Sequence, residues 1–326
     1  MIVKEKTNLL GRFMKRFNFI IICIIFFIII LSCKKTYKSI ESPTIGLMIQ
    51  VPGGAFHWGS GKDNILKISS FYMSAYEVTR KQFVDIMGYD PADLRYSGSE
   101  NDPVQNINWY HAIAFCNTVS IREGLEPVYT VDGINFDSLN FKDIPIDRDK
   151  NWDKARVDWN ANGYRLPTEA EWQWAAMGAR DKNDLPFSGS NGRNSIDDYA
   201  WYYANAGDKY LDVKWLWDDI VKNKNRTHEV GLKLPNKLGI YDMSGNVWEL
   251  CWDYYEEIPN GELQDYRGPD QGNVRVYRGG GWHDPFSPSN YMAVKFRYII
   301  NPEFQQPSVG VRLAKNVPLQ IDNVID

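Results

Sequence analysis

The sequence predicts an α+β fold in which short helices and strands are joined by much irregular chain. Three observations lead to this expectation. Only three segments carry clear helix signals, the predicted strands are short and dispersed, and the stretches between them are rich in Asn, Asp and Gly. Loops of this length are unusual unless they are functional or held in place, and bound ions are one way to hold them.

The first predicted strands cover residues 48–51 and 55–59. Pro52, Gly53 and Gly54 lie between these two runs, a composition typical of a tight turn, so we expect the runs to pair as a hairpin. A further strand is expected over residues 71–76, where aromatic and apolar side chains lead into Glu77.

Three helices are predicted from their cap residues. A Ser, Thr or Asn before an apolar periodic run, with Gln or Glu three residues later, satisfies the free N–H groups of a first turn, and a following glycine ends the helix. The predicted caps and stops are Thr79 with Gln82 and Gly88, Asn108 with Gly124, and Thr168 with Glu171 and Gly178.

The N-terminus has the features of an export signal. Five basic residues precede an apolar run over residues 20–31, which is shorter than the roughly 20 residues that a membrane-spanning helix needs. The run ends in Ile-Leu-Ser before Cys33, which resembles the lipobox of bacterial lipoproteins. We therefore expect residues 1–32 to be a signal peptide, Cys33 to carry palmitate and a membrane anchor, and residues 33–47 to be a tether. An uncleaved signal anchor is the alternative.

Charge argues against nucleic acid as a partner. Residues 1–32 hold five Lys or Arg and one Glu, so their removal leaves 32 positive and 40 negative residues, a net charge of −8. Nucleic-acid binding requires a clustered basic face. Of the two cysteines beyond Cys33, Cys116 lies on an apolar helix face and Cys251 follows a Trp-rich strand. Two buried free thiols are the favoured interpretation, and a disulfide is the alternative.

Four ordered blocks resemble the formylglycine-generating enzyme, or sulfatase-modifying factor, family. Residues 77–79 and 103–116 add earlier matches, and the resemblance covers roughly residues 48–315, which leaves a tail over 316–326. The resemblance implies a single irregular, loop-rich domain with the fold of C-type lectins, held together by calcium. The blocks are 164–172 (YRLPTEAEW), 239–250 (GIYDMSGNVWEL), 278–282 (RGGGW) and 309–313 (VGVRL).

The resemblance also implies calcium ligands. One family site, carried onto the second block, uses Asp242, Gly245, Val247 and Glu249. These residues supply the carboxylate and carbonyl oxygens that calcium prefers, although the two carboxylates also serve as simple turn caps in the competing interpretation. A second family site corresponds to Asn205 and Ala206, with its carboxylate assigned only as a guess to Asp218 or Asp219.

The oxidases of the family bind copper(I) through two cysteines five residues apart, after the Arg-Gly-Gly of the third block. Aligned without a gap, these positions are Asp284 and Ser289, and neither side chain supplies the thiolate that copper(I) selects. His283 and Asp284 are not expected to replace the site, because adjacent residues on a strand point to opposite faces.

Two hypotheses therefore remain for the function. The first is an anchored protein of the cell envelope, on the exported side, that binds or assembles a peptide, glycan or protein partner and is not an oxidase. The alternative is an oxidase that converts a cysteine of an exported, sulfatase-type substrate to formylglycine with altered metal ligands. A shared fold does not decide between them.

Overall fold

The computed structural model describes residues 37–59, 64–181, 185–192, 194–212, 214–286 and 291–318. Contacts divide the chain into residues 1–37 and residues 38–326, and the fold below is that of the second unit. The predicted signal peptide and Cys33 lie outside the described residues. Within these residues, every helix is too short or too polar to cross a bilayer.

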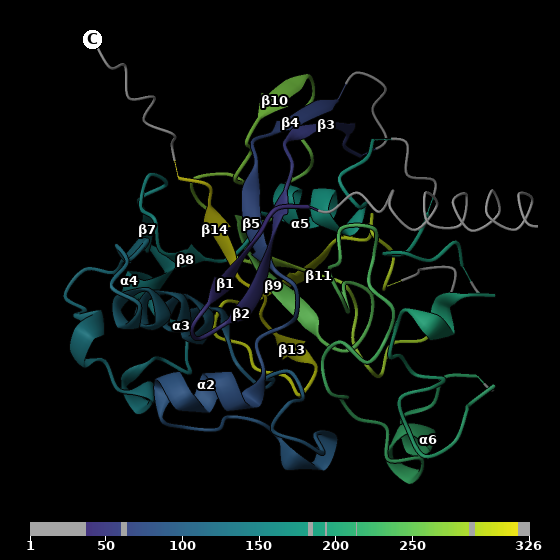
Figure 1. Ribbon diagram of the computed structural model, residues 1–326. Helices are drawn as coiled ribbons and strands as arrows, with labels where there is room; N and C mark the ends of the chain where they lie inside the picture. Colours follow the sequence, from purple (N-terminus) through teal and green to yellow (C-terminus); the bar gives the residue numbers. More distant parts are fainter. Residues whose placement is uncertain are drawn as a thin grey trace, which may run out of the picture. The chain divides into compact units, whose positions relative to one another are not determined.

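Short strands form four separate sheets, and the helices lie between and around them (Figure 1), which confirms the α+β expectation. In chain order the elements are β1 (Ser39–Ser42), β2 (Gly46–Val51), β3 (Gly54–His57), β4 (Ile65–Ile68), β5 (Phe71–Ser74), α2 (Arg80–Met87), α3 (Trp109–Arg122), β6 (Tyr129–Thr130), α4 (Lys150–Asp153), β7 (Arg156–Val157), β8 (Tyr164–Arg165), α5 (Glu169–Ala176), α6 (Trp217–Lys222), β9 (Trp248–Tyr254), β10 (Glu262–Gln264), β11 (Arg275–Arg278), β12 (Tyr298–Ile300), β13 (Val309–Gly310) and β14 (Ala314–Asn316).

The largest sheet has five strands in the order β1-β2-β5-β14-β8, and all neighbouring pairs are antiparallel. Its fourth strand, β14, comes from the end of the described chain and lies between two strands from the first half. A four-stranded sheet has the order β12-β11-β9-β13. This second sheet carries the second, third and fourth sequence blocks on adjacent strands.

The predicted hairpin is wrong, although both of its strands exist. β2 pairs with β1 and β5, whereas β3 pairs with β4 in a three-stranded sheet with β10. The Pro-Gly-Gly segment therefore passes the chain from one sheet to another. A Cβ on Gly54 would lie 2.5 Å from the ring of Trp174, so this glycine allows β3 to pack directly on α5.

The three predicted caps are confirmed. Thr79, Asn108 and Thr168 each accept a hydrogen bond from the backbone N–H three residues later, and the residue at that position completes a capping box. Gly88 adopts the left-handed conformation that ends α2, while α3 and α5 end one or two residues before the predicted glycines. Local side-chain chemistry thus defines these helix starts.

Both cysteines are free and buried, as the favoured interpretation held. Cys116 lies on α3, a helix surrounded by core residues, and Cys251 lies on β9. Burial raises the pKa of each thiol above its usual value, so neither is a reactive thiolate at neutral pH.

Candidate functional site

Asp284, which the sequence resemblance aligns with the family's first copper cysteine, has a carboxylate that is already engaged. Its Oδ2 accepts hydrogen bonds from the indole N–H of Trp248 and the backbone N–H of Gly281, both at 2.7 Å. The side chain is buried, and burial raises the pKa of this carboxyl group above its usual value. Asp284 therefore ties the loop after β11 to β9. Ser289 lies outside the described residues.

Aromatic rings surround Trp248 at this position. Its ring centroid lies 4.4 Å from that of Tyr277 and 5.7 Å from that of Tyr298, and the rings of Tyr291 and Phe296 lie at 6.3 Å. Tyr298 is 45% exposed, so the cluster reaches the protein surface. Aromatic side chains are thus packed around Trp248, beside the Asp284 loop.

His283 does not join Asp284 in a metal centre in the described structure. Its Nδ1 is buried without a hydrogen-bond partner, and its ring lies against Trp282, with centroids 5.1 Å apart. Among the described residues, no three His, Cys, Asp or Glu side chains are arranged to hold a metal ion. Calcium, in contrast, also takes backbone carbonyl oxygens as ligands.

Exposed apolar residues gather on the segment that includes α6, next to the Asp284 loop. The indole N–H of Trp215 donates to the carbonyl of His283 at 2.7 Å, and the ring of Trp217 lies 6.2 Å from that of His283. Four residues of the segment are between 38% and 53% exposed; we call them the α6 patch: Trp215, Leu216, Trp217 and Val221. Contiguous exposed apolar surface of this kind marks interaction sites.

The predicted first calcium block forms a buried turn. Asp242 and Gly245 both have positive φ angles, and a Cβ on Gly245 would lie 2.3 Å from the carbonyl oxygen of Trp201, so only glycine fits there. The Asp242 Oδ2 accepts from the backbone N–H of Gly231 at 2.7 Å, whereas its Oδ1 is buried without a partner. Burial raises the pKa of Asp242 to about 6.

Glu249 is held differently from Asp242. Its two carboxylate oxygens accept from the Arg312 guanidinium at 2.6 to 3.0 Å, and Oε2 also accepts from the indole N–H of Trp172 at 2.7 Å. All three side chains are buried, and they come from three of the four sequence blocks. The ion pair thus joins the blocks at the centre of the domain.

A third carboxylate, from Glu77, completes this buried group. It accepts hydrogen bonds from the side chain of Asn246 and the backbone N–H of Val247. Burial first, and then the charges of Asp242 and Glu249, raise its pKa well above the usual value. Three acidic side chains therefore lie around one arginine, an arrangement that favours either protonation or an added cation.

The second predicted calcium site is built from amides in the structure. The Asn205 side chain bonds to Tyr202 and Ala200, and the carbonyl of Ala206 accepts from the backbone N–H of Arg226. Side chains that follow α6 hold the segment after Ala206 in place. The side-chain oxygen of Asn223 accepts from the backbone N–H of Lys209, and its amide group donates to the carbonyl of Lys209. Asn225 donates to the carbonyl of Tyr203. Asp218 is exposed on α6 and Asp219 partly so.

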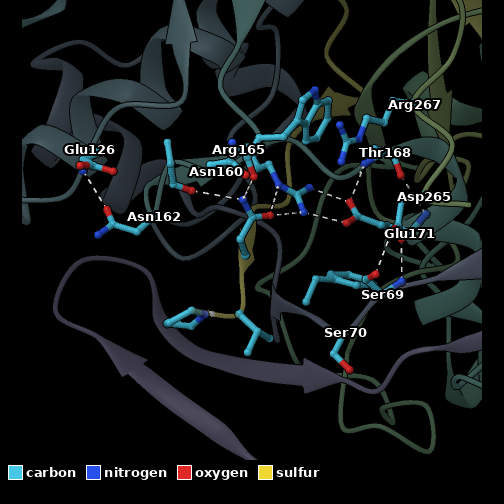
Figure 2. Close-up of a pocket in the computed structure, with 16 residues that line it drawn as sticks. Ser69, Ser70, Glu126, Asn160, Asn162, Arg165, Thr168, Glu171, Asp265 and Arg267 are labelled. Atoms are coloured by element: carbon cyan, nitrogen blue, oxygen red, sulfur yellow. Dashed lines mark hydrogen bonds and ion pairs between the residues drawn. The ribbon is translucent and has the colours of Figure 1, made fainter. Parts of the chain in front are cut away.

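Sequence reasoning missed two adjoining clefts that share Trp159 and Arg267. Figure 2 shows the smaller, of about 480 Å³, in which Arg165 points at Glu171 and is tied to it by two hydrogen bonds of 2.6 and 2.7 Å. The larger, of about 1210 Å³, lies between residues 148–157 and the loop 267–275. The repeated basic residues in 148–156 were its only sequence signal, because the opposite wall comes from over 100 residues later.

The four blocks, the buried Glu249–Arg312 pair and the irregular sheets define a formylglycine-generating-enzyme-like domain without the copper thiolate at Asp284. Residues 34–317 match the family described as the sulfatase-modifying factor enzyme 1-like domain, and the chain belongs to this family.

The proteins that this chain resembles carry names that describe different activities. The chain is 40% identical over 275 residues to "Chaperone protein LppX" of Paenibacillus barcinonensis, covering 82% of this chain and 89% of that protein. It is 26% identical over 298 residues to the formylglycine-generating enzyme of Thermomonospora curvata, covering 82% and 92%. The solved structure of Treponema denticola variable protein 1 superposes with a TM-score of 0.74 at 36% identity, covering 86% of this chain and 99% of that one.

Proposed function

We propose that this protein is a non-oxidase member of the family that binds a polypeptide partner in the cell envelope. The observation that carries the proposal is the Asp284 carboxylate, which is buried and hydrogen-bonded to Trp248 and Gly281 where the oxidases need a thiolate. The similarity to a relative named as a chaperone supports a binding role. The α6 patch, next to the Asp284 loop, is the proposed contact surface.

The absence of oxidase chemistry is tested with the purified full chain in detergent. The chain is loaded with copper(I) and given a peptide with the sulfatase-type Cys-x-Pro-x-Arg motif under oxygen, and aldehyde is measured by mass spectrometry. The formylglycine-generating enzyme of Thermomonospora curvata serves as the positive control. Aldehyde above the metal-free background from this chain would overturn the proposal.

The binding role is tested by aggregation of the reduced insulin B chain, followed by light scattering. We expect the full chain to slow aggregation, and the double variant Trp215→Ala with Trp217→Ala to lose most of this effect because the apolar contact area is removed. The matched control replaces two exposed residues away from α6, Tyr89 and Ile146, with alanine. Equal loss in both double variants, or no effect of the unmodified chain, would contradict the proposal.

We infer that calcium occupies the first block and that Asp242 is its side-chain ligand. The residues of the first block match the ligand preference of calcium in part. The unpartnered, buried Oδ1 of Asp242 is free to bind, and the carbonyl oxygens of Gly245 and Val247 supply further ligands of the kind that calcium uses. Glu249, whose side-chain oxygens are already paired with Arg312 and Trp172, contributes mainly charge. A bound calcium ion would hold the irregular turn and compensate the excess of buried carboxylates.

Lipid anchorage at Cys33 is part of the same proposal. The basic region, the short apolar run and the lipobox-like Ile-Leu-Ser-Cys support it. Labelling with radioactive palmitate in a bacterial host should be lost in Cys33→Ala and kept in Cys23→Ala, the matched cysteine control within the apolar run. Unchanged labelling of Cys33→Ala would refute the anchor.

A further inference from the structure

The larger cleft is a basic groove on an acidic protein. Six Lys or Arg residues line it against two Asp, whereas the whole chain has a net charge of −4. Potentials of one sign concentrate in a cleft with low-dielectric walls and attract ligands of the opposite sign. We call it the basic groove; its charged lining residues are Arg148, Lys150, Lys154, Arg156, Arg267, Arg275, Asp153 and Asp270.

Three cations of the groove are free to meet a ligand. Arg148 is paired with Asp153, and Arg156 with Asp132. Lys150, Lys154 and Arg267 are exposed and make no ion pair with any residue that the structure describes. Lys150 and Lys154 come from one wall of the groove and Arg267 from the other.

A fixed cation lies at the floor of the groove. Arg275 is 1% exposed, and its guanidinium carbon lies 3.4 Å from the ring centroid of Tyr254 and 3.7 Å from that of Trp109. It donates to the carbonyl of Trp252 at 2.7 Å, while its Nε has no partner. Burial lowers the pKa of Arg275 to about 10, so it remains charged at neutral pH.

The groove is also rigid before any ligand arrives. Arg148 donates to the carbonyl of Asn273 at 2.8 Å and so ties the two walls together. A Cβ on Gly272 would lie 2.7 Å from the side chain of Tyr254, which shows how closely the 267–275 loop packs on β9. A pre-formed groove lowers the entropic cost of binding.

The ring faces in the groove are already covered by guanidinium groups. Arg267 lies 4.0 Å above the ring centroid of Trp159, and Arg275 covers Tyr254. A sugar that stacks on aromatic faces therefore meets charge in place of a bare ring, whereas an anionic chain meets several separate positive charges on the two walls. Carboxylates spaced along an extended chain match these separated cations best.

We infer that the basic groove binds an acidic polypeptide segment, in an extended conformation, through Lys150, Lys154 and Arg267. The smaller cleft adjoins the groove through the shared residues Trp159 and Arg267. Its Arg165 is neutralised by Glu171, and Glu126 and Asp265 also line it, so the excess of positive charge is confined to the larger groove. The inference goes beyond the proposed function, because α6 and the elements α4 and β7 appear at opposite sides of the domain in Figure 1.

The test uses the full chain in detergent and a fluorescein-labelled twelve-residue peptide of alternating Glu and Gly. Fluorescence anisotropy should show binding that weakens as salt is raised. The double variant Lys150→Glu with Lys154→Glu should bind at least about tenfold more weakly, because two attractions become repulsions. The matched control, Lys142→Glu with Lys237→Glu, changes net charge equally on exposed lysines outside both clefts and should bind as the unmodified chain does.

Each other outcome overturns the inference. No binding of the acidic peptide, or equal loss in the two double variants, excludes a specific groove. Tighter binding of an oligogalacturonate than of the peptide at equal charge assigns the groove to an anionic glycan. The Trp215→Ala, Trp217→Ala variant should retain peptide binding, so failure of the groove and failure of the α6 patch are distinguished.

Discussion

Trp248 donates its indole N–H to the carboxylate of Asp284 across 2.7 Å, and both side chains are buried. The pair links β9 to the loop after β11, at the position that the sequence resemblance aligns with a copper cysteine of the family's oxidases. The hydrogen bonds of the Asp284 carboxylate therefore hold this loop in position.

Removal of this acid should destabilise the domain. Asp284→Ala leaves the Trp248 indole N–H and the Gly281 N–H without partners, which costs about 1–3 kcal/mol for each buried group left unsatisfied. Asp284→Asn keeps an acceptor oxygen and should remain near the unmodified stability. Urea unfolding followed by tryptophan fluorescence measures the difference. A stability of Asp284→Ala equal to that of Asp284→Asn would contradict this role.

The Glu249–Arg312 pair should be far more important than an exposed ion pair of similar length. Glu249→Ala leaves the buried Arg312 charge uncompensated, and we expect a loss of about 3–5 kcal/mol. The matched control is Glu262→Ala, which breaks the exposed pair with Lys67 at 2.8 Å and should leave the stability close to that of the unmodified chain. Chemical denaturation measures both variants. Similar losses in the two would show that the buried pair has no special role.

Chelation should lower the melting temperature if calcium is bound at Asp242. Asp242→Ala should abolish the difference between calcium and chelator, because it removes the unpartnered buried oxygen. Asp147→Ala, which removes an exposed carboxylate outside both predicted calcium sites, should keep the full difference and serves as the control. Differential scanning calorimetry provides the readout. An unchanged melt on chelation would count against the site.

His111 should make the domain sensitive to acid. Its Nδ1 accepts the backbone N–H of Asn108 in the α3 capping box, a role that requires the neutral ring, and burial lowers its pKa to about 3. Because the unfolded chain binds the proton near pH 6.5, stability is present above that pH and falls as pH is lowered towards 3. The loss amounts to about 2 kcal/mol between pH 6.5 and 5.

The control for this prediction is His111→Gln, which keeps an acceptor at the third helical position but cannot be protonated in this range. Unfolding free energies measured from pH 7 to 5 should fall less steeply for this variant than for the unmodified chain. Parallel pH profiles would exclude His111 as the cause.

Cys116 and Cys251 should be inert in the native protein. The mature chain should release no thionitrobenzoate from Ellman's reagent until it is unfolded, and then react at both of these thiols, because both are free, buried and raised in pKa. If no thionitrobenzoate is released after unfolding without a reductant, the two cysteines form a disulfide.

The sequence predicted features that depend on neighbouring residues. The caps at Thr79, Asn108 and Thr168 are formed with residues three positions away, so their chemistry can be read from a short window. The predicted hairpin is wrong because β2 pairs with β5 and β3 pairs with β4, while β3 also packs on Trp174, a residue 120 positions later. Turn signals within a short window do not indicate which strands pair in the folded protein.

The same limit applies to the site. Alignment of Asp284 with a cysteine position was enough to question oxidase chemistry, but the bond to Trp248 required the fold. The basic groove was missed because Arg267 and Arg275 lie more than 100 residues after Lys154, and only tertiary structure brings the two walls together.

The place of β14 constrains how the chain reaches its native state. This strand, from the last residues that the structure describes, is inserted between β5 and β8, and its neighbour in sequence, Arg312, closes on Glu249. A growing polypeptide therefore lacks the middle of its main sheet until residues 314–316 have been made. The five strands become one sheet only when this segment pairs with β5 and β8, so the sheet closes after the strands on both of its sides have been synthesised.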